Sequence, residues 1–187
     1  MKLAIATLKS ISPYSQSRVM QSPRNEKESA EDHEKRCWRE RMHRDAAGTV
    51  FIPPMAFKNC LSEAARYLAM QIPGKGKSTY TKHFEAGVLV TDPLPLAVHF
   101  EKVEGEWLFV PADGKRGGPK RVMRCFPVIP EWQGEVMFYI LDETITEDVF
   151  KYHLEQAGKF IGIGRFRPRN NGFYGRFSVA GIAWGEE

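Results

Sequence analysis

The chain has 187 residues, of which 42% are hydrophobic and 12% aromatic, and it carries a formal net charge of +4. This composition supplies one hydrophobic core, so we expect a single domain over residues 1–187. Three widely spaced cysteines, with no Cys-x-x-Cys pair, exclude a disulfide framework and a cysteine-based zinc site. Because the net charge is only mildly basic, the informative property is how the positive residues cluster.

Segments that would place the protein in a membrane are missing from the sequence pattern. The apolar stretch at residues 3–8 is too short for the core of a signal peptide and stops at Lys9. No window approaches the length of a membrane span. We therefore expect a soluble, cytoplasmic protein with reduced thiols and no membrane contact.

The first quarter of the chain combines a strand with a charged segment. Residues 2–11 are rich in Leu, Ile and Thr and predict a strand that ends in a polar turn. Residues 19–50 lose almost all aliphatic content, which predicts an exposed insertion with a short helix near residues 34–43. One basic island lies in this insertion, opposed by Glu40 alone. Its members are Lys35, Arg36, Arg39, Arg41 and Arg44.

A helix and a second insertion follow. Pro53 and Pro54 mark a helix start, and apolar residues recur at helical spacing over residues 55–70. The second insertion, at about residues 71–86, contains Gly-Lys-Gly-Lys-Ser-Thr. A phosphate-binding loop would require glycine at position 71, where this chain has Gln71, and would follow a strand rather than a helix. We therefore expect no nucleotide-hydrolysing site.

The second half predicts strands and one more helix. Short strands are expected at residues 88–90, 98–100, 107–110 and 122–126, with a hairpin tip at 111–119. The apolar run 136–141 is typical of a central strand buried on both faces. Thr144 and Glu147 match a capping box, which begins a helix that ends at Gly158. A last strand is expected at 176–184. A second basic island surrounds the hairpin tip, and its members are Lys115, Arg116, Lys120, Arg121 and Arg124.

The most informative segment is the glycine-rich loop, residues 158–177. It has five glycines, five positive residues, no negative residue and five aromatic residues, among them Phe166, Phe173, Tyr174 and Phe177. Guanidinium groups neutralise phosphates, and aromatic faces stack on bases. A flexible loop of this kind indicates binding of a single-stranded nucleic acid, although solvated arginines on a mobile loop are the simpler alternative.

Without the insertions, the order of elements is strand, helix, strand, strand, helix, strand. This order predicts an α+β, ferredoxin-like or RRM-like (βαββαβ) fold, in which an antiparallel sheet carries two helices on one face. The open face of such a sheet is a common platform for single-stranded RNA. The architecture hosts many activities and therefore does not fix the function.

Three motifs occur in order along the chain, at residues 8–18, 51–66 and 161–176. Together they resemble the signature regions of the RAMP superfamily of CRISPR-associated proteins. In that superfamily a strand ends in a Thr/Ser-Pro turn, an aromatic-Ile-Pro-Gly-x-Ser-Leu-Lys-Gly element opens the first helix, and a glycine-rich loop precedes the last strand. This chain departs from the second element, with Pro54 for its glycine, Ala56 for its serine and Asn59 for its second glycine.

The resemblance is strongest to the subunits that polymerise along a guide RNA in effector complexes. It implies that the first-helix element and the glycine loop bind RNA, with Lys58 at the lysine position of the element. It also implies a hairpin thumb at about residues 102–124. The residues expected to contact RNA are Ser15, Ser17, Arg18, Lys58, Asn59, Lys75, Lys77, Lys115, Arg116, Arg165, Arg167, Arg169, Asn170, Asn171, Tyr174 and Arg176.

The sequence gives weaker support for catalytic residues than for RNA-contacting residues. Some members of the superfamily cut a bound target with an aspartate between the first strand and the first helix, where this chain has Asp32 and Asp45. No local motif selects either one, and a solvated surface acid is the simpler interpretation. A metal-independent ribonuclease would instead use a histidine as acid or base, and His33, His43 and His83 are available.

Four further aromatic side chains have structural or binding interpretations. His153 and Phe57 fall on apolar helical stripes and are expected in the core. Trp38 and Trp132 could stack on bases, but Trp132, close to Pro130, is better explained as an anchor where a strand begins.

Three functions stay open. The first is a subunit that coats a guide RNA in several copies, with itself, other effector subunits and a complementary nucleic-acid target as partners. The second is an endoribonuclease that processes guide RNA. The third is a general single-strand-binding protein, or an imitator of the backbone subunit. None of these interpretations calls for a cofactor or a metal.

Overall fold

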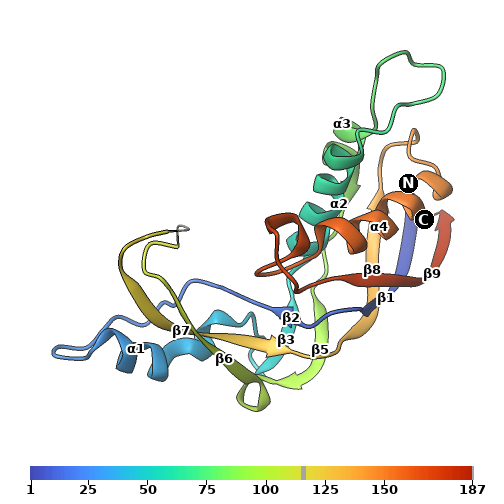
Figure 1. The fold of residues 1–187 in the computed structure, drawn as a ribbon. Helices are drawn as coiled ribbons and strands as arrows, with labels where there is room; N and C mark the ends of the chain where they lie inside the picture. Colours follow the sequence, from blue (N-terminus) through green and yellow to red (C-terminus); the bar gives the residue numbers. More distant parts are fainter. Residues whose placement is uncertain (115–116, 187) are drawn as a thin grey trace.

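The computed structural model describes residues 1–114 and 117–186. Lys115 and Arg116, two of the expected RNA contacts, therefore lie outside the described residues. The chain forms two parts that meet at an angle, a sheet-and-helix part and an arm (Figure 1).

The sheet-and-helix part contains a four-stranded antiparallel sheet in the order β4-β8-β1-β9. Its strands are β1 (Lys2–Ser10), β4 (Val88–Leu89), β8 (Gln133–Ile140) and β9 (Phe177–Glu186). Its helices are α2 (Pro54–Leu68), α3 (Thr81–Gly87) and α4 (Glu147–Gln156). Helix α2 connects β1 to β4, and helix α4 connects β8 to β9, which is the predicted ferredoxin-like arrangement.

The core of this part lies between the sheet and the two connecting helices. Along β1, the side chains of Ala4, Ala6 and Leu8 are fully buried, because alternate residues of a strand point to the same face. Phe57 of α2 and Phe150 of α4 are buried against this face. The helices therefore leave the opposite face of the sheet uncovered (Figure 1).

The arm is built largely from the segment between β4 and β8. This segment contains β5 (Leu94–His99), β6 (Glu104–Pro111) and β7 (Arg121–Ile129). Two short strands from the N-terminal region, β2 (Tyr14–Ser15) and β3 (Thr49–Ile52), also belong to the arm. Strands β6 and β7 form a long antiparallel hairpin, β2 pairs with β7, and β3 pairs with β5. The strands predicted at 98–100, 107–110 and 122–126 thus belong to the arm and not to the main sheet.

The first charged segment is not a fully exposed insertion. Helix α1 (Ala30–Cys37) and a 3₁₀ turn (Trp38–Arg41) pack on the hairpin, and Trp38 is only 6% exposed. The prediction of Trp38 as a stacking surface is therefore wrong. The Glu34 carboxylate is fully buried and accepts hydrogen bonds from Arg41, Arg124 and the Cys125 backbone N–H. Because Glu34 is paired with Arg124 of β7, helix α1 can bury one face against the hairpin although its sequence is highly charged.

The second insertion is also only partly exposed. Its second half forms helix α3, in which Phe84 is fully buried, and only the stretch before α3 loops away from the body of the molecule (Figure 1). The sequence of this segment is polar and charged apart from a few residues such as Tyr80 and Phe84, and it gives no periodic apolar pattern from which the burial of these two rings could be predicted.

Helix α4 differs from its prediction at both ends. Its N-cap is Thr146, whose hydroxyl accepts a hydrogen bond from the Val149 N–H, and not Thr144. Beyond the predicted stop at Gly158, the backbone continues as a π-turn (Ala157–Ile161). Gly158 is required by packing instead, because a Cβ there would lie 2.1 Å from the Phe177 carbonyl oxygen.

Two aromatic predictions hold. Trp132 is buried and packs edge-on against Tyr14 and Phe57 just before β8 begins, as expected for an anchor. His153 is fully buried and stacks on Phe84 at 4.3 Å. Its Nδ1 bonds the Val149 carbonyl, whereas its Nε2 has no partner among the described residues.

Candidate nucleic-acid interface

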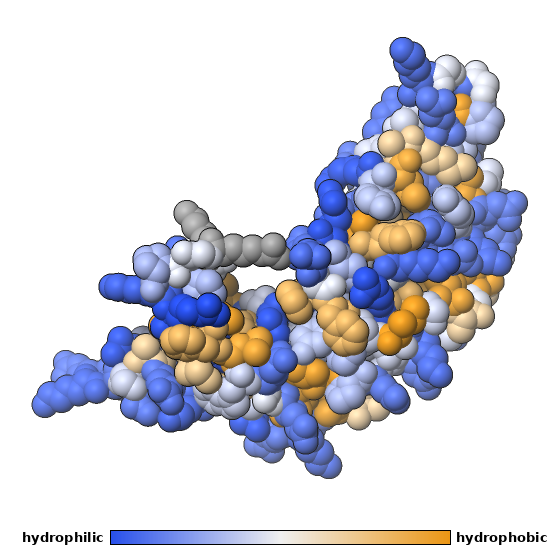
Figure 2. All heavy atoms as spheres, in the orientation of Figure 1, coloured by the Kyte–Doolittle hydropathy of each residue, from blue (hydrophilic) through white to orange (hydrophobic). Residues whose placement is uncertain are grey.

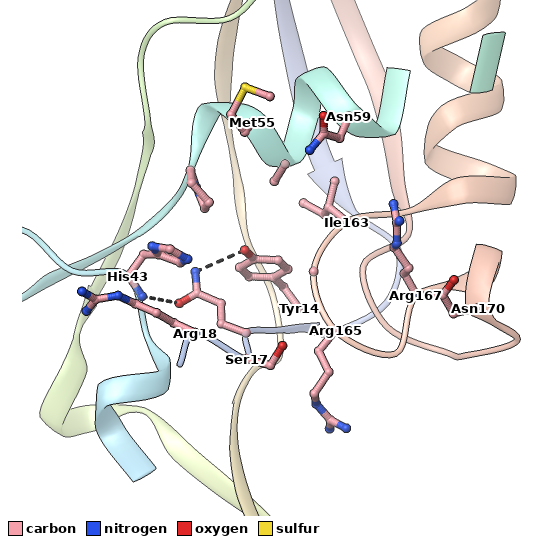
Figure 3. Close-up of a pocket in the computed structure, with 14 residues that line it drawn as sticks. Tyr14, Ser17, Arg18, His43, Met55, Asn59, Ile163, Arg165, Arg167 and Asn170 are labelled. Atoms are coloured by element: carbon pink, nitrogen blue, oxygen red, sulfur yellow. Dashed lines mark hydrogen bonds between the residues drawn. The ribbon is translucent and has the colours of Figure 1, made fainter. Parts of the chain in front are cut away.

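A cavity of about 420 Å³ opens where the three sequence motifs meet, and we call it the central pocket. It lies between the segment after β1, the start of α2 and the glycine-rich loop (Figure 3). Its lining residues are Tyr14, Gln16, Ser17, Arg18, His43, Pro53, Met55, Ala56, Asn59, Ile163, Gly164, Arg165, Arg167 and Asn170. Between the arm and the rest of the molecule the surface is hollowed (Figure 2).

Gln16 holds the floor of the central pocket together. Its carboxamide donates hydrogen bonds to the Phe51 carbonyl (2.7 Å) and the Tyr14 hydroxyl (3.2 Å), and accepts one from the His43 backbone N–H (2.7 Å). A buried amide with its bonds satisfied fixes the three segments that it joins. The first segment, the approach to α2 and the turn carrying His43 are therefore positioned by one side chain.

The glycine-rich loop is bound to the first segment rather than flexible. The Arg165 N–H donates to the Ser15 carbonyl, and the Gly175 N–H donates to the Pro13 carbonyl, both at 2.8 Å. Gly164 has φ +76°, and a Cβ there would lie 2.4 Å from the Ser15 carbonyl oxygen. Glycine is therefore required at the closest approach of the two motifs.

Arg165 fixes this arrangement with its side chain. The guanidinium lies 3.9 Å from the centre of the Phe126 ring, pairs with Glu106 at 3.1 Å and donates to the Ser15 hydroxyl at 3.2 Å. It points away from the interior of the pocket (Figure 3). Burial lowers the pKa of Arg165, and Glu106 opposes this shift. Arg165 therefore positions the loop against the hairpin.

The remaining cations differ in how much charge they can offer a ligand. Arg167 and Arg169 both pair with Glu63, at 2.9 and 3.1 Å. Arg18 is exposed at the edge of the central pocket, and its guanidinium forms no ion pair with any described residue. Arg18 is therefore the pocket cation that is most available to a phosphate.

His43 lines the same pocket. Its ring contacts Phe51. His43 is the histidine of the pocket lining, and histidine is the side chain that ordinarily gains or loses a proton closest to neutral pH. Burial, and then the charge of Arg18, lower its pKa. At neutral pH the imidazole of His43 is therefore uncharged in the free protein.

The side chain of Lys58 points toward α3 and does not line the central pocket. Its ammonium donates to the carbonyls of Phe84 (2.6 Å) and Glu85 (2.8 Å) and to the Ser62 hydroxyl (3.0 Å). Burial lowers the pKa of Lys58. Lys58 thus satisfies carbonyl groups of α3 and does not line the central pocket, unlike the position that the resemblance implied.

Other expected contacts also lie elsewhere. Lys75 and Lys77 are exposed on the loop between α2 and α3, at the far end of the molecule from the arm (Figure 1). Asn171 has φ +59° and ends a 3₁₀ turn. Tyr174 packs edge-on against Phe166, beside the guanidinium of Arg165.

The two candidate aspartates have structural roles. Asp32 lies in the first turn of α1, where its N–H bonds the Ser29 hydroxyl and its carboxylate accepts from it. Asp45 accepts two backbone hydrogen bonds within its own turn, from Ala47 and Thr49. Neither side chain lines the central pocket. Of the three candidate histidines, only His43 reaches it.

The other two histidines are engaged at separate places. His33 contacts the Ser22 carbonyl at 2.9 Å, and His83 pairs with Asp142 at 2.6 Å. Among the described residues no group of three His, Cys, Asp or Glu side chains is placed to hold a metal ion. Within the same residues, no helix has the length and apolar character to cross a membrane.

Comparison with known proteins identifies the fold. The solved structure of Cmr6 from Pyrococcus furiosus, a RAMP-type CRISPR subunit, matches 96% of this chain and 99% of that chain, with a TM-score of 0.50 and 13% sequence identity. The chain has the fold of Cmr6. The resemblance carried by the three motifs is thereby confirmed at the level of the fold. No protein-family model matches the chain, and no curated protein matches it in sequence.

Sequence reasoning on the RAMP motifs missed several residues of the site. Gln16 and Tyr14 lie inside the first motif and build the pocket floor, whereas Glu63 and Glu106 pair with loop arginines from distant segments. The position of Gln16 between two predicted contacts, Ser15 and Ser17, was the available signal. No sequence pattern near Glu63 or Glu106 indicates that these residues pair with arginines of the glycine-rich loop.

Proposed function

We propose that this protein is an RNA-binding subunit of a CRISPR-type effector ribonucleoprotein. It coats the guide RNA in several copies, together with other subunits, and presents it for pairing with a complementary nucleic-acid target. The observation that carries the proposal is the central pocket, where three separate sequence motifs converge on one concave, cationic and amide-rich surface.

The pocket has the chemistry that a single RNA strand requires. Arg18 offers a guanidinium to a phosphate. Ser17, Asn59 and Asn170 offer hydroxyl and amide groups to ribose and base edges, and Met55 offers an apolar contact. Ion pairing of Arg165 and Arg167 fixes the walls before RNA arrives, which reduces the ordering cost of binding.

The β6–β7 hairpin suits the role of a thumb. Trp107 and Phe109 lie two residues apart on one face of β6 and are 40% and 57% exposed. Arg121 of β7 lies over the Phe109 ring. An exposed aromatic pair on a paired hairpin can insert between stacked bases, where it would interrupt pairing between guide and target.

The test is to purify the protein at low and high salt, extract co-purifying nucleic acid and digest the complex with nuclease. We expect RNA that is protected in evenly spaced steps, on particles heavier than a monomer. High salt should release the RNA, because phosphate contacts dominate its affinity. A monomer that neither retains nor binds RNA would reject the proposal.

One observation favours an endoribonuclease as a second candidate. His43 lies in the central pocket, beside Arg18, where a histidine could move a proton while the guanidinium holds a phosphate. In this case the purified protein shortens added RNA, and His43→Ala abolishes cleavage while binding persists. His33→Ala is the matched control and should cleave normally. Cleavage that survives in His43→Ala would remove this candidate.

A further inference from the structure

A second cavity lies on the other side of the glycine-rich loop. It has a volume of about 250 Å³ and is formed where the C-terminal end of α2, the π-turn after α4 and the loop come together. We call it the aromatic step. Its lining residues are Tyr67, Lys159, Phe160, Pro168, Arg169 and Arg176. Two rings and three cations thus line the cavity, with no acidic residue.

The two rings form an exposed platform. Tyr67 and Phe160 are 52% and 48% exposed, their ring centres lie 5.8 Å apart, and their planes are inclined by 34°. Large aromatic side chains left open to solvent next to cations are typical of binding surfaces rather than of a core. Such rings accept a base by stacking irrespective of its sequence.

The cations surround the platform. The Arg169 guanidinium lies 5.9 Å from the centre of the Tyr67 ring and pairs with Glu63 through its Nε. Arg176 donates to the Lys159 and Phe173 carbonyls, which orients its guanidinium next to the π-turn. The Lys159 ammonium forms no ion pair with a described residue. A ligand that carries both an aromatic ring and a phosphate fits this combination.

The aromatic step and the central pocket are continuous through two elements. On α2, Asn59 lines the central pocket and Tyr67 the aromatic step, and Glu63 lies between them at helical spacing. Tyr67 lies eight positions after Asn59, which corresponds to a rise of about 12 Å along the helix. On the loop, Arg167 and Asn170 face the pocket, whereas Pro168 and Arg169 face the step.

Glu63 does not interrupt this surface for an anion. Its carboxylate is paired with Arg167 on one side and Arg169 on the other, so the local charge along the path stays positive. A strand leaving the central pocket therefore meets a cluster of two guanidinium groups and one carboxylate, with one net positive charge, before it reaches the rings.

We propose that the aromatic step is a second RNA subsite, which stacks an unpaired nucleotide of the strand held in the central pocket. This inference rests on the proposed function and extends it. The base stacks on Tyr67 and Phe160, and the adjoining phosphates contact Lys159, Arg169 and Arg176. Its ligand is a single-stranded ribonucleotide segment rather than a duplex, whose bases are already stacked.

The test measures the affinity for fluorescent oligouridylates of roughly 4 to 16 nucleotides, the range that one single-strand-binding domain covers. The variant is Tyr67→Ala with Phe160→Ala, and the control is Tyr152→Ala, which removes a ring that is 44% exposed outside both cavities. We expect the double variant to lose at least about fivefold in affinity for the longer oligonucleotides and nothing for the shortest. The control should match the wild type at every length.

Equal affinities of the double variant and the wild type at all lengths would overturn the aromatic step and leave the proposed function standing. A wild-type protein that binds no oligouridylate would overturn both. Photo-crosslinking of 5-iodouridine oligonucleotides to the wild-type protein supplies a readout that needs no variant. We expect crosslinks at Tyr67 or Phe160, and crosslinks confined to the central pocket would reject the subsite.

Discussion

The arginines of this protein divide into those that hold the fold and those that face solvent with a free charge. The Arg165 guanidinium lies over the Phe126 ring and pairs with Glu106, whereas Arg18 has no ionic partner among the described residues. Sequence alone makes them equivalent, since both lie in motifs that resemble RNA-binding regions. Their surroundings predict opposite consequences of substitution.

We predict that Arg18→Ala weakens RNA binding and reduces the salt dependence by about one phosphate contact, without changing the melting temperature. Arg165→Ala should instead lower the melting temperature by several degrees, because it removes an ion pair and a ring contact inside the structure. Binding titrations at several salt concentrations, paired with thermal unfolding, measure both effects. Equal behaviour of the two variants in both assays would contradict this division.

The pH dependence of binding follows from His43. Its pKa is lowered in the free protein by burial and by Arg18. A phosphate in the pocket would favour the charged imidazole, so RNA binding should take up a proton. We expect affinity to rise as the pH falls below about 6.5, the ordinary histidine value, and His43→Gln to flatten this rise. An unchanged pH profile in His43→Gln would remove His43 from the interface.

The stability of the free protein has the opposite dependence. His43 and His153 both have lowered pKa values, in each case chiefly because burial disfavours the charged form. The unfolded chain therefore binds more protons near its own histidine pKa than the folded protein does. Stability is complete above about pH 6.5 and falls as the pH drops through that value. Thermal unfolding without RNA over this range provides the measurement.

At the scale of elements, the glycine-rich loop is a wall of the central pocket that is held against the segment after β1 by backbone hydrogen bonds. Gly164→Ala should destabilise the protein by about 2 kcal/mol or more, because φ is positive there and the added Cβ meets the Ser15 carbonyl. Gly181→Ala in β9 is the matched control, since its Cβ would meet nothing within 4 Å. The control should change stability by less than about 0.5 kcal/mol. Similar losses in both variants by denaturant unfolding would argue against this attachment of the loop.

Helix α1 is attached to the hairpin by one buried carboxylate. Glu34→Ala leaves Arg41 and Arg124 without their partner, and we expect a loss of about 3–5 kcal/mol in unfolding free energy. Asp32→Ala, two residues earlier on the exposed side of the helix, should cost about 1 kcal/mol at most. A small effect of Glu34→Ala in urea unfolding would mean that apolar contacts alone hold the helix.

At the scale of the whole molecule, the sequence predicts the ferredoxin-like part much better than the arm. The Leu, Ile and Thr content of residues 2–11 and the helical spacing in 55–70 are local signals, and both elements are present as predicted. Pairing of β2 with β7 and of β3 with β5 joins segments far apart in the chain. No local pattern reports such pairings, so a charged stretch that packs through Glu34 is predicted as exposed.

The candidate site shows the same division. Local motifs predict that residues near Arg18, Asn59 and Arg165 share a function, and the fold brings these three residues to one pocket. The direction of Lys58 depends on where α3 docks, and the neutralisation of loop arginines depends on Glu63 and Glu106. These contacts arise only from tertiary packing, so sequence motifs alone do not separate the cations that pair within the protein from those that face solvent.

The central claim is that RNA occupies the pocket formed by the three motifs. The most direct measurement is ultraviolet crosslinking of bound RNA, followed by mass spectrometry of the crosslinked peptides. We predict crosslinks in all three motifs, around Tyr14, Met55 and Ile163. Crosslinks found only on the loop that carries Lys75 and Lys77, or none in the presence of bound RNA, would contradict the account.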